Sequence, residues 1–472
     1  MTVRAPAWAG QFYPDDPKEL ARRVDGLLDA APPAKLEGPV VAALCPHAGY
    51  EYSGACAAKA YKALRGQGFD LAVVVGTHYP YEQGLFLSPY DVYRTPLGEV
   101  PVAAEAARKL KAAAQVALSS QAHADHSVEV QIPFLQRLLG KFELLPLVAN
   151  LPDPEEAERL GEALAAATAG RRAVFIASSD LSHFPSADSA RKVDPASLAA
   201  FLTMDARYLY LADRLIMERG APGLRCAWCG LGAAAVVLCA ARRLGADCAR
   251  LLGGANSSQA GGDTDRTVGY GAAVLLRSNG SGRSRGIWPT LDLSEEEGRE
   301  LVALARTSLE ERLRRRRPAG PRLFDRSKFN LPAAVFVTWE RGDWKEGGLR
   351  GCIGTMEARE TLGNAVMRYA VASAEGDPRF EPVTLAELPG LKAEVTVLSP
   401  LRDIRPDEVA PGLGIHVARG GREGIFLPQV WEKFSGVEEF MSVLCRQKAG
   451  LPAEAWREPG TKLRAFRARC FQ

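Results

Sequence analysis

Histidine is scarce in this chain, with six among 472 residues, and long apolar runs are absent. No run reaches the roughly 18 apolar residues that a membrane span needs, and the opening MTVRAPAWAGQFYP lacks the apolar segment of a secretion signal. The formal net charge is only +3, which disfavours a nucleic-acid partner or a membrane surface. We therefore expect a cytoplasmic protein without membrane contact.

The nine cysteines are scattered, and Cys226 with Cys229 forms the one Cys-x-x-Cys pair. Without a second pair, a closed zinc site has little support. The pair is a redox couple, half of a zinc knuckle, or the source of a thiolate ligand. A reducing compartment predicts free thiols.

A stretch of glycine, serine and arginine, RSNGSGRSRG, divides the chain. It lacks the periodic spacing of apolar residues that marks a helix or a strand, which is typical of a flexible linker. After it, Ser294 and Glu297 are spaced as a capping box at the start of an amphipathic helix. We predict a first domain over 1–277, a linker over 278–289 and a second domain over 290–472.

The first domain alternates strand-like and helix-like segments, the pattern of an α/β fold. Its predicted strands include GPVVAALC, FDLAVVVGT, FELLPLVAN and RRAVFIASS, with helices such as GACAAKAYKALR between them. In the second domain, PAAVFVTWERGDWKEGGLRGCIGT predicts a hairpin, and LKAEVTVLSPL and GIFLPQVWEKF predict further strands. The second domain is therefore expected to be α+β.

Three histidines of the first domain stand where predicted strands end. His47 follows GPVVAALC, His78 follows FDLAVVVGT, and Asp180 and His183 follow RRAVFIASS. Because ligands bind beyond the carboxyl ends of strands in open α/β sheets, parallel strands would bring these side chains to one crevice. A lone histidine of this kind is more often a structural residue, but three together favour a site.

Cys229 immediately precedes an alanine-rich predicted helix, where a thiol has a lowered pKa. Two imidazoles and one thiolate suit zinc, iron or copper and leave a coordination position open, as catalytic sites do. His126 and Glu129 are one helical turn apart. In one interpretation His126 is an acid–base group and Glu129 is a carboxylate ligand of the metal. In the other, both residues only cap and pack their helix.

The first domain resembles the Memo family in PHAGYEYSG, GTHYP, YRTPLGEVPV, DHSVEVQIPFL, SSDLSHF and CGLG. That family is similar in fold to the class III extradiol ring-cleaving dioxygenases. The resemblance implies one divalent or redox metal ion, with iron first and copper or zinc as alternatives. It implies metal ligands at His47, His78 and Cys229. It also implies catalytic roles for His183, for Asp180 as the residue that orients His183, and for His126 beside the substrate.

The second domain resembles the AMMECR family in GLRGCIGT, GDPRFEPVTLAEL and CRQKAGLPAEAW. Its ligand-binding candidates are Arg350, Cys352, Asp377 and Arg379. Arginine holds phosphate or carboxylate groups, and a cysteine with a nearby base is a nucleophile. The alternative is a buried cysteine beside an arginine–aspartate structural network. The basic run RLRRRRP is typical of a solvated helix end.

Memo-like and AMMECR-like proteins resemble components of the AmmeMemoRadiSam system, which implies a radical S-adenosylmethionine enzyme as the partner. The leading prediction is a metal-dependent, dioxygenase-like oxidoreductase that acts with the second domain on an unidentified substrate. A different hypothesis is a non-catalytic metal-binding scaffold for the radical enzyme. A third, a peptide- or nucleotide-binding adaptor, depends only on the arginines of the second domain.

Overall fold

The computed structural model describes residues 1–78, 83–278, 290, 292–315, 320–342 and 348–472. The chain divides into two compact units, Met1–Ile287 and Trp288–Gln472. Apart from residue 278, the predicted linker lies outside the described residues. No helix in the described ranges is long and apolar enough to cross a membrane.

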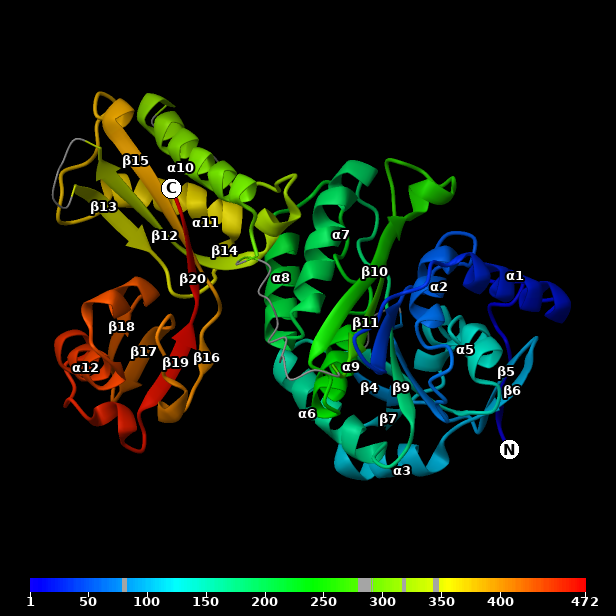
Figure 1. Ribbon diagram of the computed structural model, residues 1–472. Helices are drawn as coiled ribbons and strands as arrows, with labels where there is room; N and C mark the ends of the chain where they lie inside the picture. Colours follow the sequence, from blue (N-terminus) through cyan, green and yellow to red (C-terminus); the bar gives the residue numbers. More distant parts are fainter. Residues whose placement is uncertain (79–82, 279–289, 291, 316–319, 343–347) are drawn as a thin grey trace. The chain divides into compact units, whose positions relative to one another are not determined.

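The first unit is built on an eight-stranded sheet in the order β10-β11-β2-β9-β3-β8-β4-β7 (Figure 1). These strands are β2 (Val40–Cys45), β3 (Leu71–Gly76), β4 (Gly84–Leu87), β7 (Ala117–Leu118), β8 (Glu143–Asn150), β9 (Ala173–Ser178), β10 (Cys248–Asn256) and β11 (Gly269–Leu276). Strands β2, β9, β3 and β8 run parallel, whereas β11 pairs antiparallel with β2. The four predicted strands form this parallel centre, so the α/β prediction is confirmed. A smaller sheet contains β1 (Val3–Arg4), β5 (Val92–Thr95) and β6 (Gly98–Pro101).

Helices cover both faces of the large sheet, which is why its central strands are continuously apolar. Figure 1 shows α6, α8 and α9 on one side of the sheet and α1, α2 and α5 on the other. Helix α1 begins at an N-cap, because the Asp16 side chain accepts the N–H of Glu19 at 2.8 Å. The helices are α1 (Pro17–Ala30), α2 (Gly54–Lys62), α3 (Ala104–Ala113), α4 (His126–Glu129), α5 (Ile132–Leu139), α6 (Pro154–Ala167), α7 (Ala187–Leu202), α8 (Ala206–Glu218) and α9 (Leu231–Arg243).

The second unit has two antiparallel sheets, each with its own apolar core. The first contains β12 (Pro332–Arg341), β13 (Leu349–Gly354), β14 (Glu360–Thr361), β15 (Leu391–Leu398) and β20 (Ala468–Phe471), and α10 (Glu295–Arg315) and α11 (Leu362–Glu375) pack against it. The second contains β16 (Arg402–Asp403), β17 (Gly414–Arg419), β18 (Arg422–Phe426) and β19 (Lys462–Phe466), and it lies beside α12 (Val437–Val443). We call these two parts of the unit the first lobe and the second lobe.

Two local predictions for the second unit are confirmed, and one is wrong. Ser294 and Glu297 exchange the two hydrogen bonds of a capping box, and β12 and β13 form the predicted hairpin. The stretch GIFLPQVWEKF is not one strand, because β18 ends at Phe426 and a 3₁₀ helix follows over Pro428–Lys433. Proline has no N–H for a strand ladder, but its fixed φ suits the start of a helix.

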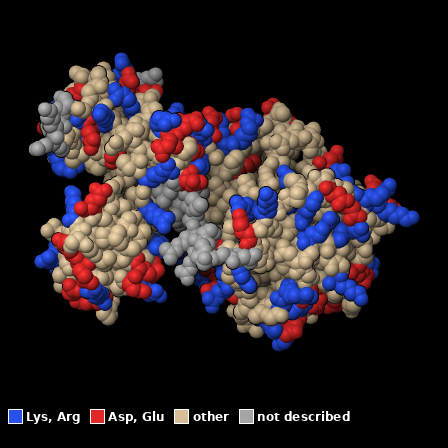
Figure 2. All heavy atoms as spheres, in the orientation of Figure 1, with Lys and Arg blue, Asp and Glu red and all other residues tan. Residues whose placement is uncertain are grey.

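Charged side chains of both signs are interspersed over the face in Figure 2. Within the predicted basic run, Arg312 pairs with Glu375 and Arg314 with Glu310. Residues 316–318 of the run lie outside the described part of the chain. The described arginines therefore act as ordinary ion-pair partners on a helix.

Candidate active site

A cavity of about 660 Å³ lies beyond the carboxyl ends of β2, β3 and β9. Its wall includes all six residues that the sequence predicts for a site in the first domain. The lining residues are His47, Thr77, His78, Asp125, His126, Asp180, His183, Phe184, Arg225, Cys226, Cys229 and Arg266. Residues far apart in sequence meet here because parallel strands end at the same edge of the sheet.

Cys229 reaches the cavity because the start of α9 packs tightly against neighbouring strand ends. Its N–H donates to the carbonyl oxygen of Asp180 at 3.1 Å. At Gly232, a Cβ atom would lie 2.7 Å from the nitrogen of Leu151 and 2.8 Å from the oxygen of Ala149. Glycine therefore sets how closely the helix start, and with it Cys229, approaches the edge of the sheet.

The contacts of His47 determine which ring nitrogen carries its proton. Nδ1 lies 3.2 Å from Oγ of Ser178, and that hydroxyl donates its own proton to the carbonyl oxygen of Ser127 at 2.5 Å. Ser178 therefore accepts from His47, so Nδ1 is protonated and Nε2 has a lone pair. Burial, opposed by the Asp180 carboxylate, lowers the pKa of His47 to about 4. A neutral imidazole of this kind is the form that binds a metal ion.

His78 has a ring nitrogen without a partner. Its Nε2 is shielded from solvent and makes no hydrogen bond to any residue that the structure describes. The residue is 3% exposed, and its ring packs edge-on against Phe86. An unpaired buried polar atom costs about 1–3 kcal/mol, and in native proteins it calls for an explanation such as a missing ion.

Asp180 and His183 occupy the loop after β9. Oδ1 of Asp180 accepts the backbone N–H of His47 at 2.7 Å, which ties this loop to the end of β2. Nδ1 of His183 lies 3.1 Å from the carbonyl oxygen of Leu181. Because a carbonyl only accepts, Nδ1 is the protonated nitrogen of the neutral tautomer, in which the lone pair is on Nε2. The contact that orients His183 is therefore with Leu181, whereas Asp180 holds His47.

Phe184, directly after His183, has a strained backbone. Its φ is 69°, in the left-handed region that residues with a side chain seldom adopt. The guanidinium of Arg266 lies 4.0 Å from the centre of the Phe184 ring. Strain of this kind tends to be retained at functional sites.

His126 stands at the start of α4, and its Nδ1 lies 2.8 Å from Oδ1 of Asp125. Its ring centre is 5.2 Å from that of His47 and 4.3 Å from that of Phe12. The imidazole is therefore held between a predicted metal ligand and the N-terminal segment.

Glu129 has a structural role, so its interpretation as a metal ligand is wrong. The residue is fully buried and forms an ion pair with Arg4. It also accepts hydrogen bonds from the Tyr13 hydroxyl and the backbone N–H of Trp8. These contacts engage the carboxylate and fix the N-terminal segment beside His126.

Two arginines of the cavity, Arg225 and Arg266, were not predicted from the sequence. Both are exposed, which places them at its opening. They lie in irregular segments without a recognisable motif. Their charges favour an anionic ligand at this end of the cavity.

Neither cysteine of the Cys-x-x-Cys pair forms a disulfide bond within the described part of the chain. Burial raises the pKa of Cys226 to about 12, which disfavours its thiolate. Cys229 is the member of the pair that adjoins helix α9.

The donor chemistry of the cavity fits a metal ion. The imidazoles of His47 and His78 and the thiol of Cys229 line one space, and a buried ring nitrogen of His78 has no described partner. Within the described ranges, no three His, Cys, Asp or Glu side chains are grouped as closely as a bound ion requires. The candidate donors therefore face a common cavity without being gathered around one point.

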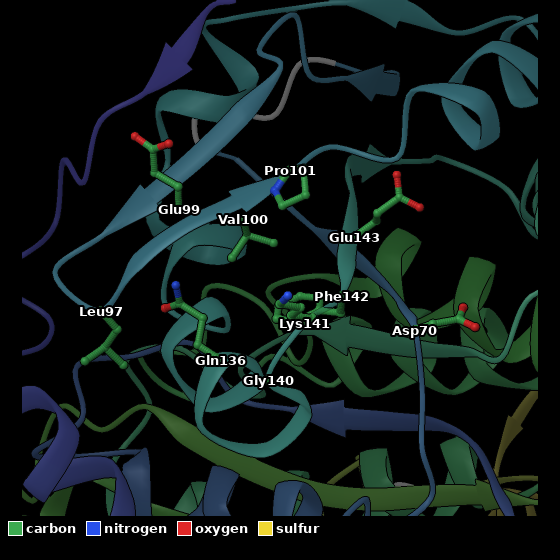
Figure 3. A pocket seen from close by; sticks show the side chains of 10 residues that line it. All are labelled: Asp70, Leu97, Glu99, Val100, Pro101, Gln136, Gly140, Lys141, Phe142 and Glu143. Atoms are coloured by element: carbon green, nitrogen blue, oxygen red, sulfur yellow. The ribbon is translucent and has the colours of Figure 1, made fainter.

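A second hollow, of about 590 Å³, lies at the opposite ends of the strands (Figure 3). Its carboxylates include Asp70 just before β3 and Glu143 at the start of β8, and both pair with Arg171. Glu99 pairs with Arg94. None of its described lining residues is a histidine or a cysteine, so the candidate chemistry of the sheet lies at its carboxyl edge.

The four candidates of the second domain are engaged in structural contacts. Arg350 forms two hydrogen bonds with the Glu387 carboxylate, at 2.9 and 3.3 Å. Asp377 accepts from the Arg379 guanidinium and from the backbone N–H of Cys352, and these contacts hold the pKa of Asp377 well below its usual range. This arrangement is the arginine–aspartate network that the sequence offered as the alternative, and the ligand-binding role stays a prediction.

The architecture defines a class of protein: an α/β unit with a histidine-rich cavity, followed by a separate unit of antiparallel sheets and helices. The family model for Memo-like protein matches residues 4–274, and the model for AMMECR1 matches residues 302–471. The chain belongs to the Memo-like protein family and carries an AMMECR1 domain after its Memo-like domain.

Similar proteins occur in several archaea. A MEMO1 family protein of Methanosarcina mazei is 36% identical, and the match covers 58% of this chain and 100% of that protein. A MEMO1 family protein of Nitrosopumilus maritimus is 33% identical, and the match again covers 58% of this chain and 100% of that protein. A crystal structure of an uncharacterized protein from Pyrococcus horikoshii is 35% identical, covers 38% of this chain and 92% of its own, and has a TM-score of 0.35.

Proposed function

We propose that the first unit is a non-haem, metal-dependent oxidoreductase of dioxygenase-like type that binds one metal ion. The ligands would be His47, His78 and Cys229. Iron is the first candidate, and copper or zinc follow. The observation that supports this most is the convergence of three histidine-bearing strand ends and the start of α9 on one cavity.

The protonation states inferred from hydrogen bonding support the same assignment. Nε2 of His47 has a lone pair, and Nε2 of His78 is buried without a described partner. A bound ion would supply Lewis acidity and, if it were iron or copper, a redox couple.

The remaining side chains would handle the proton and the substrate. His183 lines the cavity wall and donates from Nδ1 to Leu181, so its neutral tautomer would have the lone pair of a general base on Nε2. His126, held by Asp125, would face the substrate, and Asp180 would keep His47 in place through its backbone N–H. Arg225 and Arg266 would attract an anionic substrate group at the opening.

The first test is the metal content of protein purified without oxygen, measured by mass spectrometry. We expect about one metal ion per chain, lost in His47→Gln, His78→Gln and Cys229→Ser. His416→Gln and Cys248→Ser are the controls, because neither residue lines the cavity. Full metal content in all three cavity variants would overturn the ligand assignment.

The alternative function is a metal-binding scaffold without turnover. Its supporting observation is that the proposed ligand set has a cysteine and no carboxylate, since Glu129 is engaged by Arg4 instead. Oxygen uptake by the metal-loaded, reduced protein separates the two. Uptake that is lost in His183→Gln while metal content is retained supports the oxidoreductase, and no uptake by any loaded form supports the scaffold.

Two domain types in one chain also support a common task. Covalent linkage raises the effective concentration of one domain near the other. We propose that both act with a radical S-adenosylmethionine enzyme. Co-purification with such an enzyme from the source cells, compared with chains lacking either domain, tests this partner.

A further inference from the structure

The second unit contains a cavity of about 480 Å³ between its two lobes. Thr355–Arg359, after β13, contribute from the first lobe, and strands β17, β18 and β19 contribute from the second. Small-molecule sites favour such junctions, and this volume is in their usual range. The four predicted candidates of this domain do not line it.

Three cations line this cavity, from three separate segments. Arg359 comes from the first lobe, and Lys448 and Arg464 come from the second. Arg359 is exposed and pairs with Glu357 at 2.8 Å. Nε of Arg464 is shielded from solvent and has no hydrogen-bond partner among the described residues.

The orientation of Arg464 is fixed by a buried histidine. Its Nη2 lies 3.2 Å from Nδ1 of His416, and Nε2 of His416 lies 3.1 Å from Oε2 of Glu423. A guanidinium only donates, so Nδ1 accepts, and Nε2 carries the proton that it donates to Glu423. Burial lowers the pKa of His416, which keeps this ring neutral.

Lys448 is presented by an unusual backbone segment. It lies in a π-helical turn, Leu444–Ala449, a form that is rare and frequent at functional sites. At Gly424 on β18, a Cβ atom would lie 2.6 Å from the nitrogen of Ala449 and 2.8 Å from Cβ of Lys448. A glycine at this place lets the π turn pack closely on the strand and brings Lys448 to the cavity.

Apolar side chains form another part of the wall: Met356, Leu401 and Ile425. They give room for an organic group beside the cations. Arginine binds phosphate oxygens bidentately, and lysine adds a point charge. We propose that this interlobe cavity binds a small phosphorylated organic molecule, with the phosphate held by Lys448, Arg464 and Arg359.

The test is calorimetric titration of the full chain with phenyl phosphate, inorganic phosphate and benzoate at constant ionic strength. We expect phenyl phosphate to bind at one site per chain, more tightly than inorganic phosphate, and benzoate to bind least. Lys448→Gln should weaken phenyl phosphate binding at least about fivefold. Arg446→Gln is the matched control, since it removes a charge from the same π turn outside the cavity, and it should stay within about twofold.

A second readout gives the location of binding. The ring nitrogens of His416, assigned in ¹⁵N-histidine spectra with His416→Gln, should shift when phenyl phosphate is added. Arg464→Gln should also weaken binding. If Arg464→Gln does not fold, Lys448→Gln alone tests the role of the cations. The proposal is overturned by no binding up to about 10 mM, by unchanged affinity in Lys448→Gln, by a shift confined to other histidines, or by benzoate binding as tightly.

Discussion

At the scale of single residues, the loop that carries His183 depends on a buried carboxyl. Asp194 on α7 is 7% exposed, and its Oδ1 accepts the backbone N–H of Ser182 at 3.1 Å. Burial raises the pKa of Asp194 to about 7, although the hydrogen bond from Ser182 opposes this shift.

This carboxyl predicts a pH dependence of stability. An acid with a higher pKa in the folded than in the unfolded state binds its proton more tightly when folded. The contribution of Asp194 to the free energy of unfolding is therefore complete below about pH 4 and is lost as the pH rises to about 7. The change is about 4 kcal/mol at most. Calorimetric unfolding of the wild type should show the first unit losing stability between about pH 4 and pH 7.

Asp194→Asn, which mimics the neutral acid, should lose less stability than the wild type over that range. Asp188→Asn is the control on the same helix. Asp188 is exposed, and its contacts with Lys192 and Arg191 lower its pKa, so its contribution is already present above pH 5. If the unfolding free energy of Asp194→Asn fell with pH as steeply as that of the wild type, another group would be the one that titrates.

At the scale of elements, the start of α9 connects packing with the candidate chemistry. The helix places Cys229 at the cavity, and Gly232 permits its close approach to the backbone after β8. Gly26 on α1 offers a contrast, because a Cβ atom there would meet nothing within 4 Å.

Gly232→Ala should destabilise the first unit by about 1–3 kcal/mol, because a backbone contact cannot yield as a flexible side chain does. Gly26→Ala should stabilise it by about 1 kcal/mol through helix propensity. Urea unfolding of both variants measures these two changes in the free energy of unfolding. A neutral Gly232→Ala would mean that α9 shifts without cost, and the position of Cys229 would then not be fixed by this contact.

At the scale of the whole molecule, each unit has an apolar core of its own. A domain with its own core can fold alone. The polypeptides 1–277 and 290–472, produced separately, should each unfold cooperatively at about the temperature of the matching transition in the full chain. Loss of either transition in the separate polypeptides would show that the units stabilise one another.

Local signals predicted much of the first unit. Apolar runs such as those ending before His47 and His78 became the parallel centre of the sheet, because a strand buried on both faces must be apolar throughout. The capping residues Asp16 and Ser294 fixed helix starts through short-range hydrogen bonds. Pro428 was the signal that the strand expected over GIFLPQVWEKF had to end, as β18 does at Phe426.

The sequence alone determined the two domains, the α/β class of the first, and the set of six side chains at its cavity, because strand periodicity and strand ends are local properties. Only the tertiary structure decided that Glu129 pairs with Arg4, that Leu181 orients His183, and that Arg225 and Arg266 reach the opening. These outcomes depend on which side chains meet across the fold. The interlobe cavity of the second unit was likewise invisible in the sequence, because Arg359 lies about 90 residues before Lys448 and about 105 before Arg464, and only packing brings them together.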